Sequence, residues 1–266
     1  MSRVRDMVDC TQISRPTQGS IFNFAHHEDY PSDEILGLLI TARCDIANDK
    51  ADKFSYLPTI PLGIWCKKEL PAILKARESK SVENQLNTYL KKTNLTTNSV
   101  KIYGFNNIRT VFNNQLGRKD KEKGLEKLDR YEALTKSSDH HYLKTYFEKE
   151  IELIFKDIIK NKHMSYFFID EIGSYGPCIT NLREVSHMDS NAAKIISGGI
   201  ELHKLTDRKS PINCINNIDP DGIACLIGQL RSPYIELLMQ RFAENFTRIG
   251  IDDPSDDLIS SIATRF

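Results

Sequence analysis

The chain has 266 residues, of which 40% are hydrophobic and 27% are charged, and its 36 basic residues balance 36 acidic ones. These proportions are ordinary for a soluble globular protein. No apolar run approaches the roughly 18 residues of a membrane span, and residues 1–10 hold no apolar signal segment, so we predict a cytoplasmic protein with no membrane partner.

Charge is distributed unevenly along the chain. Residues 66–162 hold 21 lysines and arginines against 13 aspartates and glutamates, a net charge of +8, so the remainder carries −8. A basic module of this kind can bind RNA or DNA. It can equally be a solvated helical surface that docks on acidic parts of its own chain, and the sequence leaves both interpretations open.

Three short strands are predicted near the N-terminus, after a polar lead-in. Residues 20–24 alternate like a strand, and residues 35–40 are nearly all apolar, as in a strand buried on both faces. Residues 54–60 resume with aromatic and β-branched side chains. The charged segment 48–53 therefore forms a turn between the second and third strands.

Two adjacent histidines, His26 and His27, precede Glu28 and Asp29 in the loop after the first strand. Imidazole and carboxylate groups can bind a divalent metal ion. Neighbouring side chains of an extended segment point to opposite sides, so the two histidines do not easily reach one ion. We therefore interpret this segment as a solvated loop and predict no metal site.

Residues 66–162 are predicted to form an all-helical insertion, because the hydrophobic period changes there from two to 3.6. Pro71 marks a kink or the first turn of a helix. The clearest helix follows Ser138 and Asp139, which are favourable N-cap residues. Its apolar positions recur at helical spacing: Leu143, Phe147, Ile151, Ile154 and Ile158.

Strands resume after the insertion, at residues 165–169, 178–185 and 223–227. A terminal helix follows Ser232, with a core stripe of Leu238, Met239, Phe242 and Phe246. Neither group of strands is large enough for a core alone. We therefore predict that residues 17–61 and 163–250 form one small β-barrel and its helix, with 1–16 and 251–266 as terminal extensions.

The order of these motifs resembles the PemK/MazF-type toxin barrel. Segments 18–21 (Gln-Gly-Ser-Ile), 37–41 and 56–60 are similar to the family's first three strands. Segment 179–185 is similar to a later strand and turn of the family. Segment 226–230 and the terminal helix are similar to the family's last strand and the amphipathic helix that follows it. The resemblance implies an α+β fold: a small SH3-like (PemK/MazF-like) β-barrel interrupted by an α-helical insertion, with a C-terminal helix packed on the barrel.

The resemblance also implies an endoribonuclease site. Such an enzyme needs a cation for the developing negative charge and a group that moves the 2′-hydroxyl proton. Arg43 and Thr59 are the candidate catalytic residues, with Asp45 orienting Arg43. The chain departs from the family at Ile35, where its members have an arginine. The other interpretation of Arg43, Cys44 and Asp45 is a turn in which Asp45 binds backbone amides.

Other chemistry has weaker support. Six scattered cysteines without a CxxC pair argue against a disulfide framework or a structural zinc site. A Cys44 nucleophile would need a histidine brought close by the fold. Asp170 and Glu171 could bind Mg²⁺, or they are simply the polar end of a strand. We predict no cofactor.

Two functions remain as expectations. The first is a nucleic-acid-contacting barrel protein of a bacterial toxin–antitoxin or phage-defence system, with RNA or DNA as partner and a divergent endoribonuclease as its enzymatic form. The second is a catalytically inactive adaptor or regulatory subunit that binds a partner protein through residues 66–162.

Overall fold

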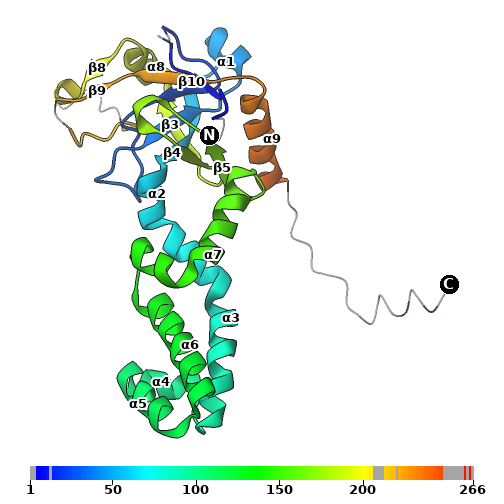
Figure 1. The fold of residues 1–266 in the computed structure, drawn as a ribbon. Coiled ribbons are helices and arrows are strands. Elements are labelled where there is room, and N and C mark those ends of the chain that lie inside the picture. The colour runs from blue at the N-terminus through cyan, green and yellow to red at the C-terminus, as the bar shows by residue number, and fades with distance from the viewer. Residues whose placement is uncertain are drawn as a thin grey trace.

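The computed structural model describes residues 4–11, 14–205, 213–219, 221–247, 261 and 264. It combines a curled antiparallel sheet with a long helical arm that projects from one end of that sheet (Figure 1). The predicted α+β class is therefore confirmed. Residues 248–250, at the end of the predicted barrel-and-helix unit, and nearly all of the extension 251–266 lie outside the described residues.

The main sheet has the strand order β1-β10-β2-β3-β4-β6-β5, with β7 paired beside β6 along β4. All pairings are antiparallel. The strands are β1 (Val8–Asp9), β2 (Ser20–Phe22), β3 (Leu36–Leu39), β4 (Lys53–Pro61), β5 (Tyr166–Ile169), β6 (Cys178–Asn181), β7 (Ser186–Asp189) and β10 (Leu226–Leu230). A separate ribbon joins β8 (Ile200–Glu201) to β9 (Ile223–Ala224).

Strands from both sides of the insertion therefore share one sheet, as predicted. Two boundaries differ. Strand β1 lies in the segment predicted to be an extension and pairs with β10. Residues 223–227 are divided between β9 and β10, and Ile223 is exposed.

The two outer strands of this order are tied by side chains. Arg5, just before β1, forms an ion pair with Asp170, just after β5. The Arg5 backbone N–H and Nε both donate to the Asp170 carboxylate at 2.8 Å. Although burial raises the pKa of Asp170, the hydrogen bonds and charge of Arg5 lower it below its usual value. This clasp brings the ends of the curled sheet together.

Each face of the sheet has its own core. Ile21, Leu38 and Leu57 belong to one face, which helix α9 covers. Phe22 and Tyr56 belong to the other, where their rings meet edge to face at 5.1 Å. Gly37 lies beneath this pair, and a Cβ there would stand 2.2 Å from the Phe22 ring. Only glycine fits between these rings.

The arm consists of helices α2 (Leu62–Lys68), α3 (Leu70–Lys92), α4 (Thr97–Tyr103), α5 (Phe105–Gln115), α6 (Arg118–Lys136) and α7 (His140–Ile159). The predicted insertion is thus helical but begins at Leu62, four residues early. The five predicted apolar positions of α7 are all buried, and Asp139 caps the helix by accepting from the His141 N–H at 2.9 Å. Trp65 is fully buried at the base of the arm, edge to face with Tyr166.

Among the described residues, three other helices flank the sheet: α1 (Arg43–Ala47), α8 (Ser190–Ser197) and α9 (Tyr234–Phe246). Two short turns are η1 (Gly173–Tyr175) and η2 (Leu202–Leu205). Helix α9 buries Leu238 completely, and Met239 and Phe242 partly, as predicted.

The prediction for Phe246 is wrong, because 61% of this side chain is exposed. Arg241 and Asn245 donate to the carbonyls of His163 and Met164 at 3.1 and 3.0 Å, so these polar residues face the loop before β5 instead.

Candidate functional site

The sequence-predicted residues Arg43 and Asp45 lie on α1, which directly follows β3. The Arg43 guanidinium is exposed and lies 3.6 Å from Glu236 on α9. Asp45 accepts a weak hydrogen bond from the Cys44 thiol at 3.5 Å. The segment is therefore a short helix and not a turn. We predicted that Asp45 orients Arg43, but the carboxylate that pairs with Arg43 is that of Glu236.

Thr59 lies elsewhere, in the middle of the sheet. Its side chain is fully buried, and its hydroxyl forms a hydrogen bond with that of Thr180 at 2.9 Å. The register pairs Thr59 with Leu36 at the start of β3, whereas Arg43 follows the end of that strand. The structure therefore does not bring Thr59 together with Arg43, and a buried hydroxyl of this kind cannot reach a substrate.

A different group of polar residues does converge. An open pocket of about 470 Å³ lies between the loop after β2, the middle of β4 and the segment that joins β6 to β7. It is lined by His26, His27, Glu28, Asp29, Tyr56, Glu184, Val185, Ser186, His187 and Asn213. We call it the histidine pocket.

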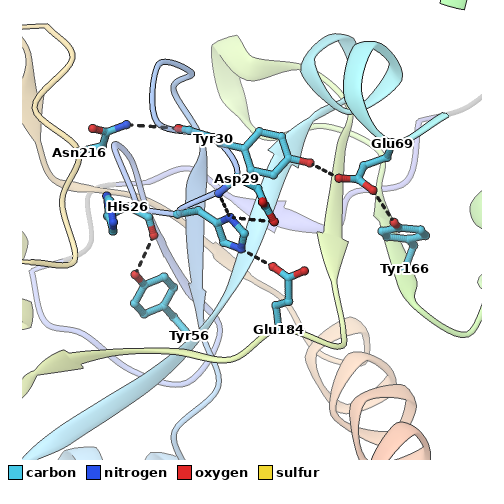
Figure 2. Close-up of polar contacts among 9 residues, drawn as sticks. His26, Asp29, Tyr30, Tyr56, Glu69, Tyr166, Glu184 and Asn216 are labelled. Atoms are coloured by element: carbon cyan, nitrogen blue, oxygen red, sulfur yellow. Dashed lines mark hydrogen bonds and ion pairs between the residues drawn. The ribbon is translucent and has the colours of Figure 1, made fainter. Parts of the chain in front are cut away.

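His27 and Glu184 both line this pocket and contact each other across it. Figure 2 shows the Glu184 carboxylate at this contact. The His27 Nε2 atom contacts the Glu184 carboxylate in a close hydrogen bond. The other ring nitrogen, Nδ1, accepts from the Asp29 backbone N–H at 3.1 Å. A neutral imidazole with Nδ1 as acceptor carries its proton on Nε2. His27 therefore donates to Glu184 and holds its carboxylate as an acceptor in a fixed position.

The same geometry bears on metal binding. Donor atoms of His27, Asp29 and Glu184 lie within 4.8 Å of one another, and an imidazole with two carboxylates is a donor set that divalent cations use. However, both nitrogens of His27 already take part in hydrogen bonds. In this arrangement the His27 ring offers no free lone pair to a cation. His27 and Glu184 therefore form a hydrogen-bonded dyad, with the Asp29 carboxylate nearby.

The loop that carries His27 is anchored at several points. The Tyr56 hydroxyl donates to the His26 carbonyl at 3.2 Å, and Asn216 donates to the Pro31 carbonyl at 3.0 Å. Tyr30 and Tyr166 donate to the two carboxylate oxygens of Glu69, at 2.8 and 3.2 Å (Figure 2). Because Glu69 lies between α2 and α3, this clasp fixes the loop to the base of the arm.

Burial, followed by the neighbouring Glu69 carboxylate, raises the pKa of both Tyr30 and Tyr166 well above the usual value. Both phenols are therefore fixed as hydrogen-bond donors at neutral pH. The pocket loop is thus preorganised by neutral donors that do not titrate in the physiological range.

Two further histidines border the pocket and are exposed. His26 has an exposed side chain and is one of the lining residues of the pocket. The His187 Nδ1 atom lies 3.2 Å from the Ser55 hydroxyl, its partner across β4 and β7. An exposed imidazole and an oriented carboxylate are the two groups that general acid–base catalysis requires.

The prediction of a solvated loop at residues 26–29 is wrong for His27, whose side chain is only 10% exposed. The run of two histidines and two acidic residues was a usable signal for a site. Glu184 carried no such signal, because it lies 157 residues away and joins His27 only through the fold.

Comparisons with models of known protein families, with curated proteins and with solved structures found no match to this chain. The resemblance to the PemK/MazF-type barrel therefore stays a prediction. In the described part of the chain, no helix has the length and apolar character needed to cross a bilayer.

Proposed function

We propose that this protein contacts nucleic acid and cleaves RNA in the histidine pocket, as a divergent endoribonuclease of a bacterial toxin–antitoxin or phage-defence system. One observation carries the proposal: an oriented carboxylate and an exposed imidazole, Glu184 and His26, line one open pocket. The cellular setting rests on the PemK/MazF-like resemblance alone. The proposal moves the chemistry from Arg43, Asp45 and Thr59 to this pocket.

The proposed reaction needs no group from outside the chain. Glu184 takes the proton of a ribose 2′-hydroxyl, and the resulting oxygen attacks the adjacent phosphorus. The bond from phosphorus to the 5′-oxygen breaks, and His26 gives that oxygen a proton. The products are a 2′,3′-cyclic phosphate and a 5′-hydroxyl. His27 is a positioning residue, since it contacts Glu184.

The charge of the molecule supports nucleic acid as the partner. Residues 66–162 carry +8, whereas the pocket contains three carboxylates and no lysine or arginine among its described lining residues. A phosphodiester must therefore be held largely by cations outside the pocket. The arm supplies such cations, and long-range attraction by a basic surface speeds the capture of an anionic chain.

Cleavage of an RNA that carries one 2′-deoxy substitution tests the proposal. Wild-type protein should cut an all-ribose oligonucleotide and leave 2′,3′-cyclic phosphate ends. A 2′-deoxy sugar at the cut position should stop cleavage there, because the nucleophile is gone. Cleavage that continues past the 2′-deoxy position, or the absence of any cleavage, would contradict the proposed chemistry.

A second candidate function is the adaptor role. Ile102 and Tyr103, at the far end of the arm, are exposed apolar side chains of the kind that protein interfaces bury. A pull-down from the native host distinguishes the two functions: recovery of one defined protein without nucleic acid supports the adaptor, and recovery of nucleic acid alone counts against it.

A further inference from the structure

Positive charge is concentrated at the distal end of the arm, where the end of α3 meets α4, α5 and the start of α6 (Figure 1). Residues 91–123 hold eight lysines and arginines against two acidic residues, a net charge of +6. This third of the insertion therefore accounts for most of its net charge of +8.

Five lysines of this distal end form no ion pair within the described chain. They are Lys91 at the end of α3, Lys101 in α4, and Lys119, Lys121 and Lys123 at the start of α6. The Lys92–Asp120 ion pair, at 2.7 Å, joins the end of α3 to the start of α6 and so keeps these groups at one end of the arm. Unpaired like charges held together favour an anionic ligand.

The same end of the arm also carries an exposed aromatic side chain, at the end of α4. Tyr103 is 57% exposed and Ile102 is 74% exposed, directly before Gly104, where the chain turns between α4 and α5 with a φ of 78°. Asn107 donates to the Tyr103 carbonyl at 2.8 Å, so the backbone that presents the ring is fixed. The segments at this end of the arm also expose amide side chains: Asn94, Asn98, Asn106, Asn113, Asn114 and Gln115.

We propose that the distal end of the arm binds single-stranded nucleic acid, with backbone phosphates on the unpaired lysines and a base stacked on Tyr103. Cations that follow the backbone and an aromatic platform for a base are the two elements of single-strand recognition. A protein partner fits less well, because lysine is depleted from protein–protein interfaces. This inference deepens the proposed function by naming the ligand of the arm, yet its evidence is independent of the histidine pocket.

The test measures binding of a fluorescently labelled 20-nucleotide RNA or single-stranded DNA to the full chain at several salt concentrations. In the distal variant, Lys91, Lys101, Lys119 and Lys123 are each changed to Gln. A matched control changes four other exposed arm lysines to Gln: Lys75, Lys80, Lys144 and Lys149. Both variants lose the same net charge, so only position differs.

The distal variant should bind at least tenfold more weakly. The plot of log affinity against log salt concentration should become less steep by about 3, because each lost phosphate contact to a single strand contributes about 0.7 to the slope. The control should change affinity by less than about threefold.

Tyr103→Ala should weaken binding about fivefold or more while Tyr103→Phe preserves it, because stacking needs only the ring. Tyr142→Ala, at another exposed tyrosine of the arm, should have no effect.

Equal losses in the distal and control variants would overturn the inference, as would a wild-type protein that binds neither RNA nor DNA at low salt. A protein partner bound through Tyr103, without nucleic acid, would also overturn it. Nucleic acid that binds at the distal end but is never cut would support this inference and remove the catalytic role of the pocket, so the two proposals fail separately.

Discussion

His27 donates its Nε2 proton to Glu184, and the Asp29 backbone N–H, 3.1 Å from Nδ1, fixes the ring in that tautomer. The bond joins the loop after β2 to the segment between β6 and β7, which are separated in sequence by the entire helical arm. A largely buried imidazole thus fixes the orientation of a half-exposed carboxylate at the edge of an open pocket.

His27→Ala tests this relationship. Glu184 should lose its orienting donor, and a displaced catalytic group of this kind costs about 100-fold in rate. We expect kcat for RNA cleavage to fall by roughly that factor with KM nearly unchanged, because the substitution leaves the proposed RNA-binding site on the arm intact. Ser32→Ala, at an exposed residue of the same loop that does not line the pocket, is the matched control. A variant that loses cleavage only because its melting temperature collapses would count against a positioning role.

Glu69 should be important for attaching the arm. Glu69→Ala removes the acceptor of both Tyr30 and Tyr166, and leaving buried donors unpaired costs about 1–3 kcal/mol of unfolding free energy. Chemical denaturation measures this loss. Glu148→Ala, at an exposed carboxylate of α7, should be nearly neutral. Equal stability of the two variants would show that the hydrogen bonds of Tyr30 and Tyr166 to Glu69 do not stabilise the fold.

The same phenols predict how stability depends on pH. Their pKa values are raised above 10 in the folded chain, so their contribution to stability is complete below pH 10 and is lost as pH rises through the folded values. Tyrosinate absorbance from the buried phenols should therefore appear only together with alkaline unfolding. Smooth titration of all ten tyrosines near pH 10 in a still-folded protein would contradict this.

Gly37 offers a clean test of packing in the sheet. Gly37→Ala would place a methyl group within the Phe22–Tyr56 ring pair, and overpacking of this kind costs about 1–3 kcal/mol. We expect the melting temperature to fall by several degrees. Gly63→Ala is the control, because a Cβ in that helix meets nothing within 4 Å and alanine favours helix by about 1 kcal/mol. A more stable Gly37→Ala variant would contradict the packing.

Thiol reactivity should divide the six cysteines. Burial raises the pKa of Cys66 to about 11, those of Cys178 and Cys214 to about 12, and that of Cys225 above its usual value. Cys10 and Cys44 are exposed. Because the thiolate is the reactive form, these two should react rapidly with a disulfide reagent at pH 8 and the buried thiols slowly until the chain unfolds. Rapid reaction of Cys178 in the native protein would contradict the fold around β6.

Local patterns in the sequence were sufficient to predict much of this fold. The buried stripe on α7 was predictable, because its apolar residues recur at helical spacing along the twenty residues of this helix. The apolar run of β3 predicted a strand covered on both faces, which the two cores confirm.

Features that depend on register and on distant contacts were not predictable. Whether Thr59 faces solvent or Thr180 depends on how β4 pairs with β6, which no local pattern reveals. Phe246 fits the stripe of α9 by spacing, but Arg241 and Asn245 contact the loop before β5 and set the helix rotation. The His27–Glu184 dyad required the complete fold.

The most direct test of the proposed active site compares two variants in one RNA-cleavage assay, with equal binding of the RNA verified in parallel. Glu184→Gln keeps the shape of the side chain but removes the base, so cleavage should fall by about 100-fold to 10,000-fold. Arg43→Ala, at the exposed residue paired with Glu236, should retain cleavage within about threefold of wild type. The opposite result, full activity in Glu184→Gln and loss in Arg43→Ala, would place the chemistry at α1 and contradict a catalytic histidine pocket.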